Sequence, residues 1–166
     1  MTEAQPRAFR DDRELVLGWA AISLASRAEA GAREVGLTLS QFRVLTLLAW
    51  QTATPSRLAA AMDLKPPSVT RLVDRLVRLG FVARAVDDTD RRRVTQVVTP
   101  AGWDAIERGC RAIAGEVDAI STSTPGIDTA AVDHGLAEFQ RAVYALWWTP
   151  GQAPPGWPAR EAAPDP

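Results

Sequence analysis

Residues 66–80 read PPSVTRLVDRLVRLG and predict an amphipathic helix. Pro66 and Pro67 fit the first turn, where no backbone N–H is needed, and Gly80 is typical of a helix end. One face is apolar and consists of Val69, Leu72, Val73 and Leu76. The polar side chains are Ser68, Thr70, Arg71 and Arg75, the last two being four apart and therefore on one side. Such a helix fits a DNA major groove; the alternative is a solvated edge with incidental arginines.

A shorter helix precedes this one, and a hairpin follows it. Thr54-Pro55 is a helix start, because threonine caps first-turn amides and proline has no N–H to leave unpaired. That helix runs to about Met62, and the turn 63–65 completes a helix-turn-helix unit. The segments 81–86 and 94–99 are rich in β-branched and apolar residues, so we expect a hairpin wing with a charged tip.

Longer helices flank this unit on both sides. Residues 11–35 lack proline and place Leu15, Trp19 and Ile22 at helical spacing. Thr38 and Gln41 form a capping box for a helix that runs to about Trp50 and has Phe42, Leu45 and Leu48 on its inner face.

The C-terminal part of the chain predicts two more helices. Thr99-Pro100 starts the first, whose apolar seam recurs in steps of three and four residues: Trp103, Ile106, Cys110, Ile113, Val117 and Ile120. Such a seam favours packing against another helix. After a break at 121–128, a last helix is marked by Val132, Leu136, Phe139, Val143 and Leu146.

Charge is distributed unevenly along the chain. The net charge is −1, but residues 56–99 hold nine basic and five acidic side chains. A basic centre between acidic flanks favours a polyanionic partner. At the hairpin tip, Arg91, Arg92 and Arg93 suit a phosphate ridge or the narrow minor groove. Asp90 is placed to hold Arg92 by a charge-assisted hydrogen bond; the alternative is a solvated loop.

The composition argues against several classes of function. One cysteine, Cys110, and one histidine, His134, leave no disulfide framework, no metal set and no catalytic triad, and a Gly-rich phosphate loop is absent. We therefore expect no catalytic activity and no cofactor. With no run of about 18 apolar residues and no secretory signal, we expect a cytoplasmic protein that does not bind membranes. The seam position of Cys110 predicts a buried, inert thiol.

These motifs together resemble the MarR family of bacterial transcription regulators. The residues that carry the resemblance lie within about 10–148: Leu58-Ala59, the run from Pro67 to Leu76, Gly80, Asp87, Asp90-Arg91-Arg92, and Thr99 to Gly102. The resemblance implies a homodimer in which the first and the last two helices of each chain intertwine. It also implies that Arg92 enters the minor groove with Asp90 as its brace, and that the polar residues of 66–80 lie toward the major groove.

Many members of that family release DNA when a small phenolic or anionic molecule enters a cleft between the dimer helices and the DNA-binding lobe. Candidates to line such a cleft here are Trp19, Arg27, Arg43 and Trp50, because aromatic faces and a guanidinium suit an aromatic acid. The alternative, which we favour, is that Trp19 and Trp50 are core residues. One branch of the family senses peroxides through a cysteine in its first helix, and the first helix here has none.

The sequence thus predicts a mainly α fold with a small β-hairpin wing. We expect a flexible arm at 1–10, a helical dimerisation region at 11–36 and 100–148, a winged helix-turn-helix lobe at 37–99, and a disordered Pro-rich tail at 149–166. The predicted function is a ligand-responsive repressor that binds double-stranded DNA sequence-specifically, as a homodimer on a palindromic operator. The alternative is a winged-helix protein-interaction module without specific DNA binding.

Overall fold

The computed structural model describes residues 12–50, 55–86 and 94–147. These residues form α1 (Arg13–Glu34), α2 (Leu39–Trp50), α3 (Pro55–Met62), α4 (Pro66–Arg78), β1 (Val82–Val86), β2 (Val94–Val98), α5 (Pro100–Ser123) and α6 (Thr129–Trp147). The mainly α fold with one hairpin is confirmed. The expected arm at 1–10 and tail at 149–166 lie outside the described residues.

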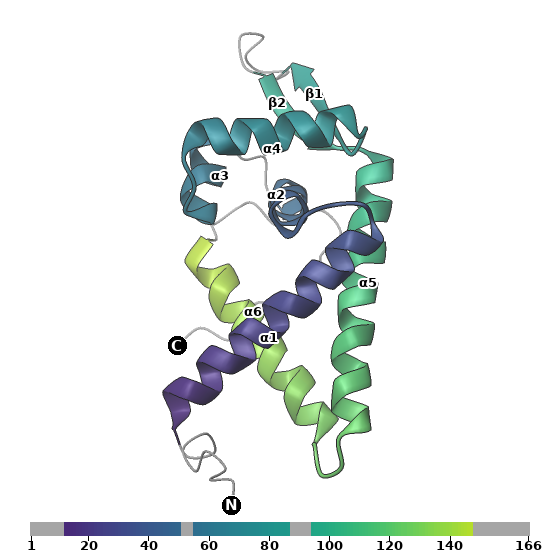
Figure 1. Ribbon diagram of the computed structural model, residues 1–166. Helices are drawn as coiled ribbons and strands as arrows, with labels where there is room; N and C mark the ends of the chain where they lie inside the picture. Colours follow the sequence, from purple (N-terminus) through teal and green to yellow (C-terminus); the bar gives the residue numbers. More distant parts are fainter. Residues whose placement is uncertain (1–11, 51–54, 87–93, 148–166) are drawn as a thin grey trace, which may run out of the picture.

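Two parts can be distinguished in Figure 1. A lobe at one end contains α2, α3, α4 and the hairpin, with α4 lying between α2 and the hairpin. The other part contains α1, α5 and α6. Helix α5 runs away from the lobe and α6 returns, while α1 packs against α5 near the lobe and then diverges from it (Figure 1). None of the described helices is long and apolar enough to cross a membrane.

Capping residues set the helix starts. The backbone N–H of Thr38 donates to Gln41 Oε1 at 2.9 Å, and that of Gln41 donates to Thr38 Oγ1 at 3.3 Å, so the predicted capping box is confirmed. Helix α6 starts at Thr129, before its first apolar marker, because the Asp128 carboxylate accepts from the N–H of Ala131. Helix α5 continues to Ser123 and so extends into the break expected at 121–128.

The hydrophobic core lies in the lobe. Its largest fully buried side chains are Leu45, Leu58, Leu76, Val44, Val69 and Val82, which come from α2, α3, α4 and β1. The predicted inner face of α2 is buried, as is that of α4 except for Leu72, which is half-buried. Antiparallel pairing runs from Val82 opposite Val98 to Val86 opposite Val94. The core therefore fixes α4 with its polar side chains outward.

A tight junction joins the lobe to α5. Gly80 ends α4 in the left-handed region, at φ +77°, where a residue with a Cβ is strained. The Thr99 hydroxyl donates to Gly80 O at 2.6 Å and accepts from the N–H of Gly102 at 3.1 Å. The N–H of Thr99 donates to Phe81 O at 3.0 Å. The end of α4, both ends of the hairpin and the start of α5 are thus held together.

The buried face of α5 consists of small residues, namely Gly102, Ala105 and Gly109. A Cβ at Gly109 would lie 2.5 Å from the ring of Phe42, so α2 can approach only where α5 has glycine. A Cβ at Gly31 of α1 would likewise collide with Ile113. The prediction that Cys110 is buried is wrong for the single chain. Its side chain is exposed, whereas Trp103, Ile106 and Ile113 of the same seam are partly buried against the core.

Gly102 has no room for a side chain, because an added Cβ would collide with the backbone oxygen of Phe81. We expect Gly102→Ala to lower the free energy of unfolding by about 1–3 kcal/mol through overpacking. Gly115, on the same helix, has nothing within 4 Å of an added Cβ. Gly115→Ala is therefore the control and should raise that free energy by about 0.5–1 kcal/mol. Urea denaturation measures both, and equal stabilisation by the two substitutions would contradict the close approach.

Candidate nucleic-acid interface

The outer face of α4 carries the polar side chains that the sequence singled out. Ser68, Thr70, Arg71 and Arg75 are all exposed, on the side away from the buried Val69, Val73 and Leu76. Arg78 is exposed as well and lies three residues beyond Arg75, so it extends the basic stripe by one turn. The sequence prediction left it out, although the same spacing rule would have found it.

The hydroxyl of Thr70 has a defined orientation. Its Oγ1 donates to the backbone oxygen of Pro66 at 3.1 Å, one turn back along α4. Its proton is therefore used within the helix, and its lone pairs can accept a hydrogen bond from outside. Next to it, the guanidinium of Arg71 offers donors only. The face thus presents both donors and an acceptor, as base-edge recognition requires.

An ion pair that the sequence reasoning missed joins α4 to the wing. Arg84 Nη2 of β1 donates to Asp74 Oδ1 of α4. Both side chains remain partly exposed, so the pair contributes at most about 1 kcal/mol to stability. Its larger effect is electrostatic, because Arg84 neutralises the carboxylate that lies beside the basic stripe and would repel a phosphate.

The turn between α3 and α4 fixes how α4 is presented. Asp63 has φ +53°, which is left-handed and which aspartate tolerates better than most residues. The N–H of Leu64 donates to Ala59 O at 2.9 Å and that of Asp63 to Ala60 O at 3.3 Å. These two bonds are a Schellman ending, so α3 stops sharply and α4 begins after three residues. The sequence predicted the turn but not its left-handed residue.

The wing strands lie beside α4, and residues 87–93 connect them in the sequence. Asp90, Arg91, Arg92 and Arg93 lie outside the described residues, so their contacts with DNA stay a prediction. The strands that lead to the tip are paired, and Thr95 Oγ1 adds a hydrogen bond to Ala85 O at 3.3 Å.

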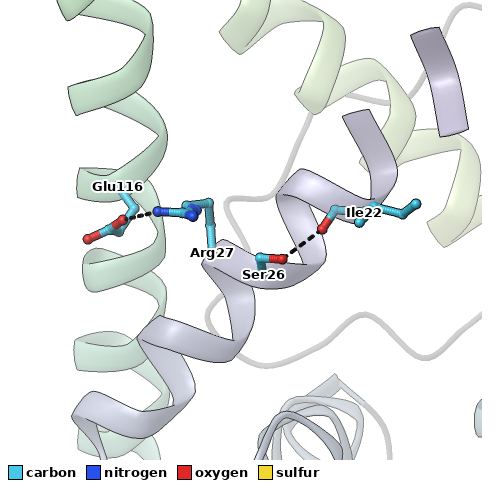
Figure 2. A network of polar contacts seen from close by, with 4 residues as sticks. All are labelled: Ile22, Ser26, Arg27 and Glu116. Carbon is cyan, nitrogen blue, oxygen red and sulfur yellow. Dashed lines mark hydrogen bonds and ion pairs between the residues drawn. The ribbon is translucent and has the colours of Figure 1, made fainter. Parts of the chain in front are cut away.

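The four candidate effector residues are found in different settings. Trp19 is 58% exposed, so the prediction that it is a core residue is wrong for the single chain. Arg27 pairs with Glu116 of α5 at 3.0 Å (Figure 2). Arg43 is exposed on α2, and the side chain of Trp50 lies outside the described part. Arg27 also lines an apolar hollow formed by residues of α1, α5 and α6, and neither Trp19 nor Arg43 lines it.

Known proteins with similar sequences identify the family. The MarR family profile matches residues 35–93, from the end of α1 to the wing tip. An uncharacterized HTH-type transcriptional regulator of Mycobacterium leprae is 34% identical over 97 residues, which cover 58% of this chain and 68% of that protein. The chain belongs to the MarR family. An HTH-type regulator of Mycobacterium tuberculosis is 39% identical over 77 residues, 46% of this chain and about half (54%) of its own length.

Solved structures confirm the MarR fold. CouR from Rhodococcus jostii RHA1, bound to p-coumaroyl-CoA, has a TM-score of 0.62 at 22% identity, over 84% of this chain and 96% of CouR. A mutant of S. aureus MepR bound to an oligodeoxyribonucleotide has a TM-score of 0.58 at 17% identity, over 80% of this chain and 98% of MepR. MarR proteins are transcription regulators rather than enzymes, and the helix-turn-helix of this chain is α3 and α4.

Cys110 of this MarR protein lies on α5, at the surface of the single chain. Partial desolvation by its neighbours nevertheless raises the pKa of its thiol above the ordinary value. A raised pKa lowers the thiolate fraction at neutral pH, and thiolate is the reactive form. Among the described residues, no three or more His, Cys, Asp or Glu side chains gather as metal ligands.

We therefore expect Cys110 to react slowly with a chromogenic disulfide reagent at neutral pH. The rate should rise with pH to a midpoint above the usual thiol pKa of about 8.5. Stopped-flow absorbance over a pH series measures it, with the urea-unfolded chain as control. A folded protein that reacts as fast as the unfolded chain at neutral pH would contradict the assignment.

Proposed function

We propose that this MarR protein is a homodimeric repressor that binds a palindromic operator sequence-specifically and releases it when a small molecule binds. The observation that carries the proposal is the outer face of α4, on which Ser68, Thr70, Arg71 and Arg75 are exposed while the opposite face is buried. A helix held in this way by a helix-turn-helix can enter a major groove with its N-terminal half toward the bases.

The charges of the lobe support binding to a polyanion. Arg71, Arg75 and Arg78 follow one stripe of α4, and Arg84 neutralises Asp74 beside it. In the proposed complex, Arg71 and Arg75 contact base edges or phosphates, and Arg92, braced by Asp90, reaches the minor groove. The oligodeoxyribonucleotide bound to MepR supports DNA as the partner for this fold.

Exposed apolar side chains support a dimer formed by α1, α5 and α6. The first 18 residues of α1 include no buried side chain. The large apolar side chains exposed in this part of the chain are Leu15, Val16, Leu17, Trp19, Ile22, Leu24, Ile120, Ile127 and Phe139. Apolar surface of this extent on one part of a protein marks an interaction site. A two-fold dimer would present two α4 helices to half-sites about one DNA turn apart.

The effect of a ligand would be a shift between two spacings of the lobes. A molecule that binds better to the dimer with the wrong spacing lowers the population that fits the operator. CouR, which binds p-coumaroyl-CoA, supports small-molecule binding by this fold.

Operator binding should depend on Arg71 and Arg92. We expect Arg71→Ala to cost about 1–3 kcal/mol in affinity for a specific site, and Arg92→Ala to weaken binding and its salt dependence, because a cation is removed from the interface. Mobility shift with the duplex that flanks the gene, over a salt series, measures both.

Arg33→Ala is the matched control, because Arg33 is exposed on α1, pairs only loosely with Glu29 at 3.7 Å, and lies on a different helix from the basic stripe. It should bind DNA nearly as the unaltered chain does. If all three variants and the unaltered chain bind alike, or if binding has no sequence preference, the protein-interaction alternative replaces the repressor.

Dimerisation should depend on the exposed apolar residues of the helical part. Phe139 of α6 is 69% exposed in the single chain, and we expect Phe139→Glu to weaken the dimer by about 2 kcal/mol or more, as for a central interface residue. Val97→Glu is the control, since Val97 is exposed on β2 in the lobe. Sedimentation equilibrium gives the dissociation constants, and an unchanged dimer in Phe139→Glu would place the contact elsewhere.

A further inference from the structure

An apolar hollow of about 410 Å³ lies where α1, α5 and α6 approach one another. Its walls are mainly aliphatic, with two serines, and include Leu24, Val117, Ile120, Val132 and Leu136. The described residues that line it include no aromatic side chain and no charged group except Arg27. Its volume lies within the range of about 300–1,000 Å³ that is usual for small-molecule sites.

Arg27 reaches the rim of this hollow from α1 and is held by Glu116. Glu116 Oε2 accepts a hydrogen bond from Arg27 Nη1 at 3.0 Å, across the space between α1 and α5 (Figure 2). Glu116 itself does not line the hollow; it lines a separate, more polar groove with Gly31 and Gly115. The two side chains are 41% and 46% exposed, so their pairing is weak and exchangeable.

We infer that the hollow binds a medium-chain aliphatic carboxylate. The alkyl chain lies among the aliphatic walls, and the carboxylate accepts hydrogen bonds from Arg27 in competition with Glu116. An aliphatic ligand is favoured over an aromatic one because the walls offer no ring to stack on, and a carboxylate because the charge at the rim is a guanidinium. Binding of the carboxylate to the hollow is independent of the proposed function. Only the role of this ligand as the effector that releases DNA rests on it.

The hollow differs from the expected effector cleft and adjoins the proposed subunit contact. It lies among three helices of the helical part, whereas the sequence placed the cleft against the DNA-binding lobe. Of the exposed apolar residues assigned above to the subunit contact, Leu24 and Ile120 line it, whereas Trp19, Ile22 and Phe139 do not. Gly135 does, and a Cβ there would meet nothing within 4 Å, so the space beside α6 is open in the single chain.

Calorimetric titration of the full-length protein with decanoate tests the charge. Decan-1-ol, which has the same chain length and no charge, is the control ligand. We expect decanoate to bind at least about tenfold more tightly than decanol, and Arg27→Gln to abolish that difference, because a hydrogen bond to a charged group is lost. Glu116→Gln removes the carboxylate that competes for Arg27, so this variant should bind decanoate more tightly. If the ion pair were purely structural, both Arg27→Gln and Glu116→Gln would bind decanoate more weakly.

A second pair of variants tests the location. Gly135→Leu fills the hollow and should abolish binding, while Gly115→Leu adds the same side chain at a position of α5 that does not line the hollow and should not. The inference is overturned if decanoate and decanol bind with equal affinity, if decanoate does not bind, or if Gly135→Leu leaves decanoate binding unchanged. Absence of decanoate binding together with dissociation of the dimer by Gly135→Leu assigns the hollow to a second copy of the chain. The titrations contain no DNA, so their outcome can be distinguished from a failure of the protein to bind an operator.

Discussion

The hydroxyl of Thr99 holds the two parts of the molecule together. It donates to Gly80 O at the end of α4 and accepts from the N–H of Gly102 in the first turn of α5. The backbone of Phe81 lies against Gly102 so closely that only glycine fits there. Helix α4, the wing strands and α5 are therefore joined without a flexible linker. A change in the direction of α5 must move the basic stripe of α4 and the wing as one unit.

The helical part of the single chain is stabilised differently from the lobe. Near the lobe, α1 packs closely on α5 because Gly31 leaves room for Ile113, and α2 packs closely on α5 because Gly109 leaves room for Phe42. Farther away, the contacts are an exposed ion pair and the walls of an open hollow. Most of α1 is exposed although much of it is apolar. A helix of this composition needs a covering partner to bury its apolar residues, which the subunit contact of the proposed dimer supplies.

Much of the fold could be predicted from the sequence because local chemistry sets it. Thr38 and Thr99 act through hydrogen bonds to residues three positions away, and Gly80 through its left-handed backbone, so the starts of α2 and α5 and the end of α4 followed from the pattern. The apolar periodicity of α4 likewise gave its buried and exposed faces. Periodicity could not say what covers an apolar face, and so Trp19 and Cys110 were wrongly expected to be buried. Arg84 with Asp74 and Arg27 with Glu116 join different elements, which no local rule pairs.

Helix α5 connects the hollow to the lobe. Thr99 and Val117 stand at the two ends of 18 helical steps, a distance of about 27 Å at 1.5 Å per residue. Between them the helix is continuous, and its glycine contacts hold it close to α2 only at the lobe end. In the proposed mechanism, a small tilt produced where α5 meets Arg27 would be transmitted along this continuous helix to the Thr99 junction, where α4 is attached. In a two-fold dimer the tilt acts on both lobes, so the spacing between two α4 helices is the quantity that a ligand in the hollow would change.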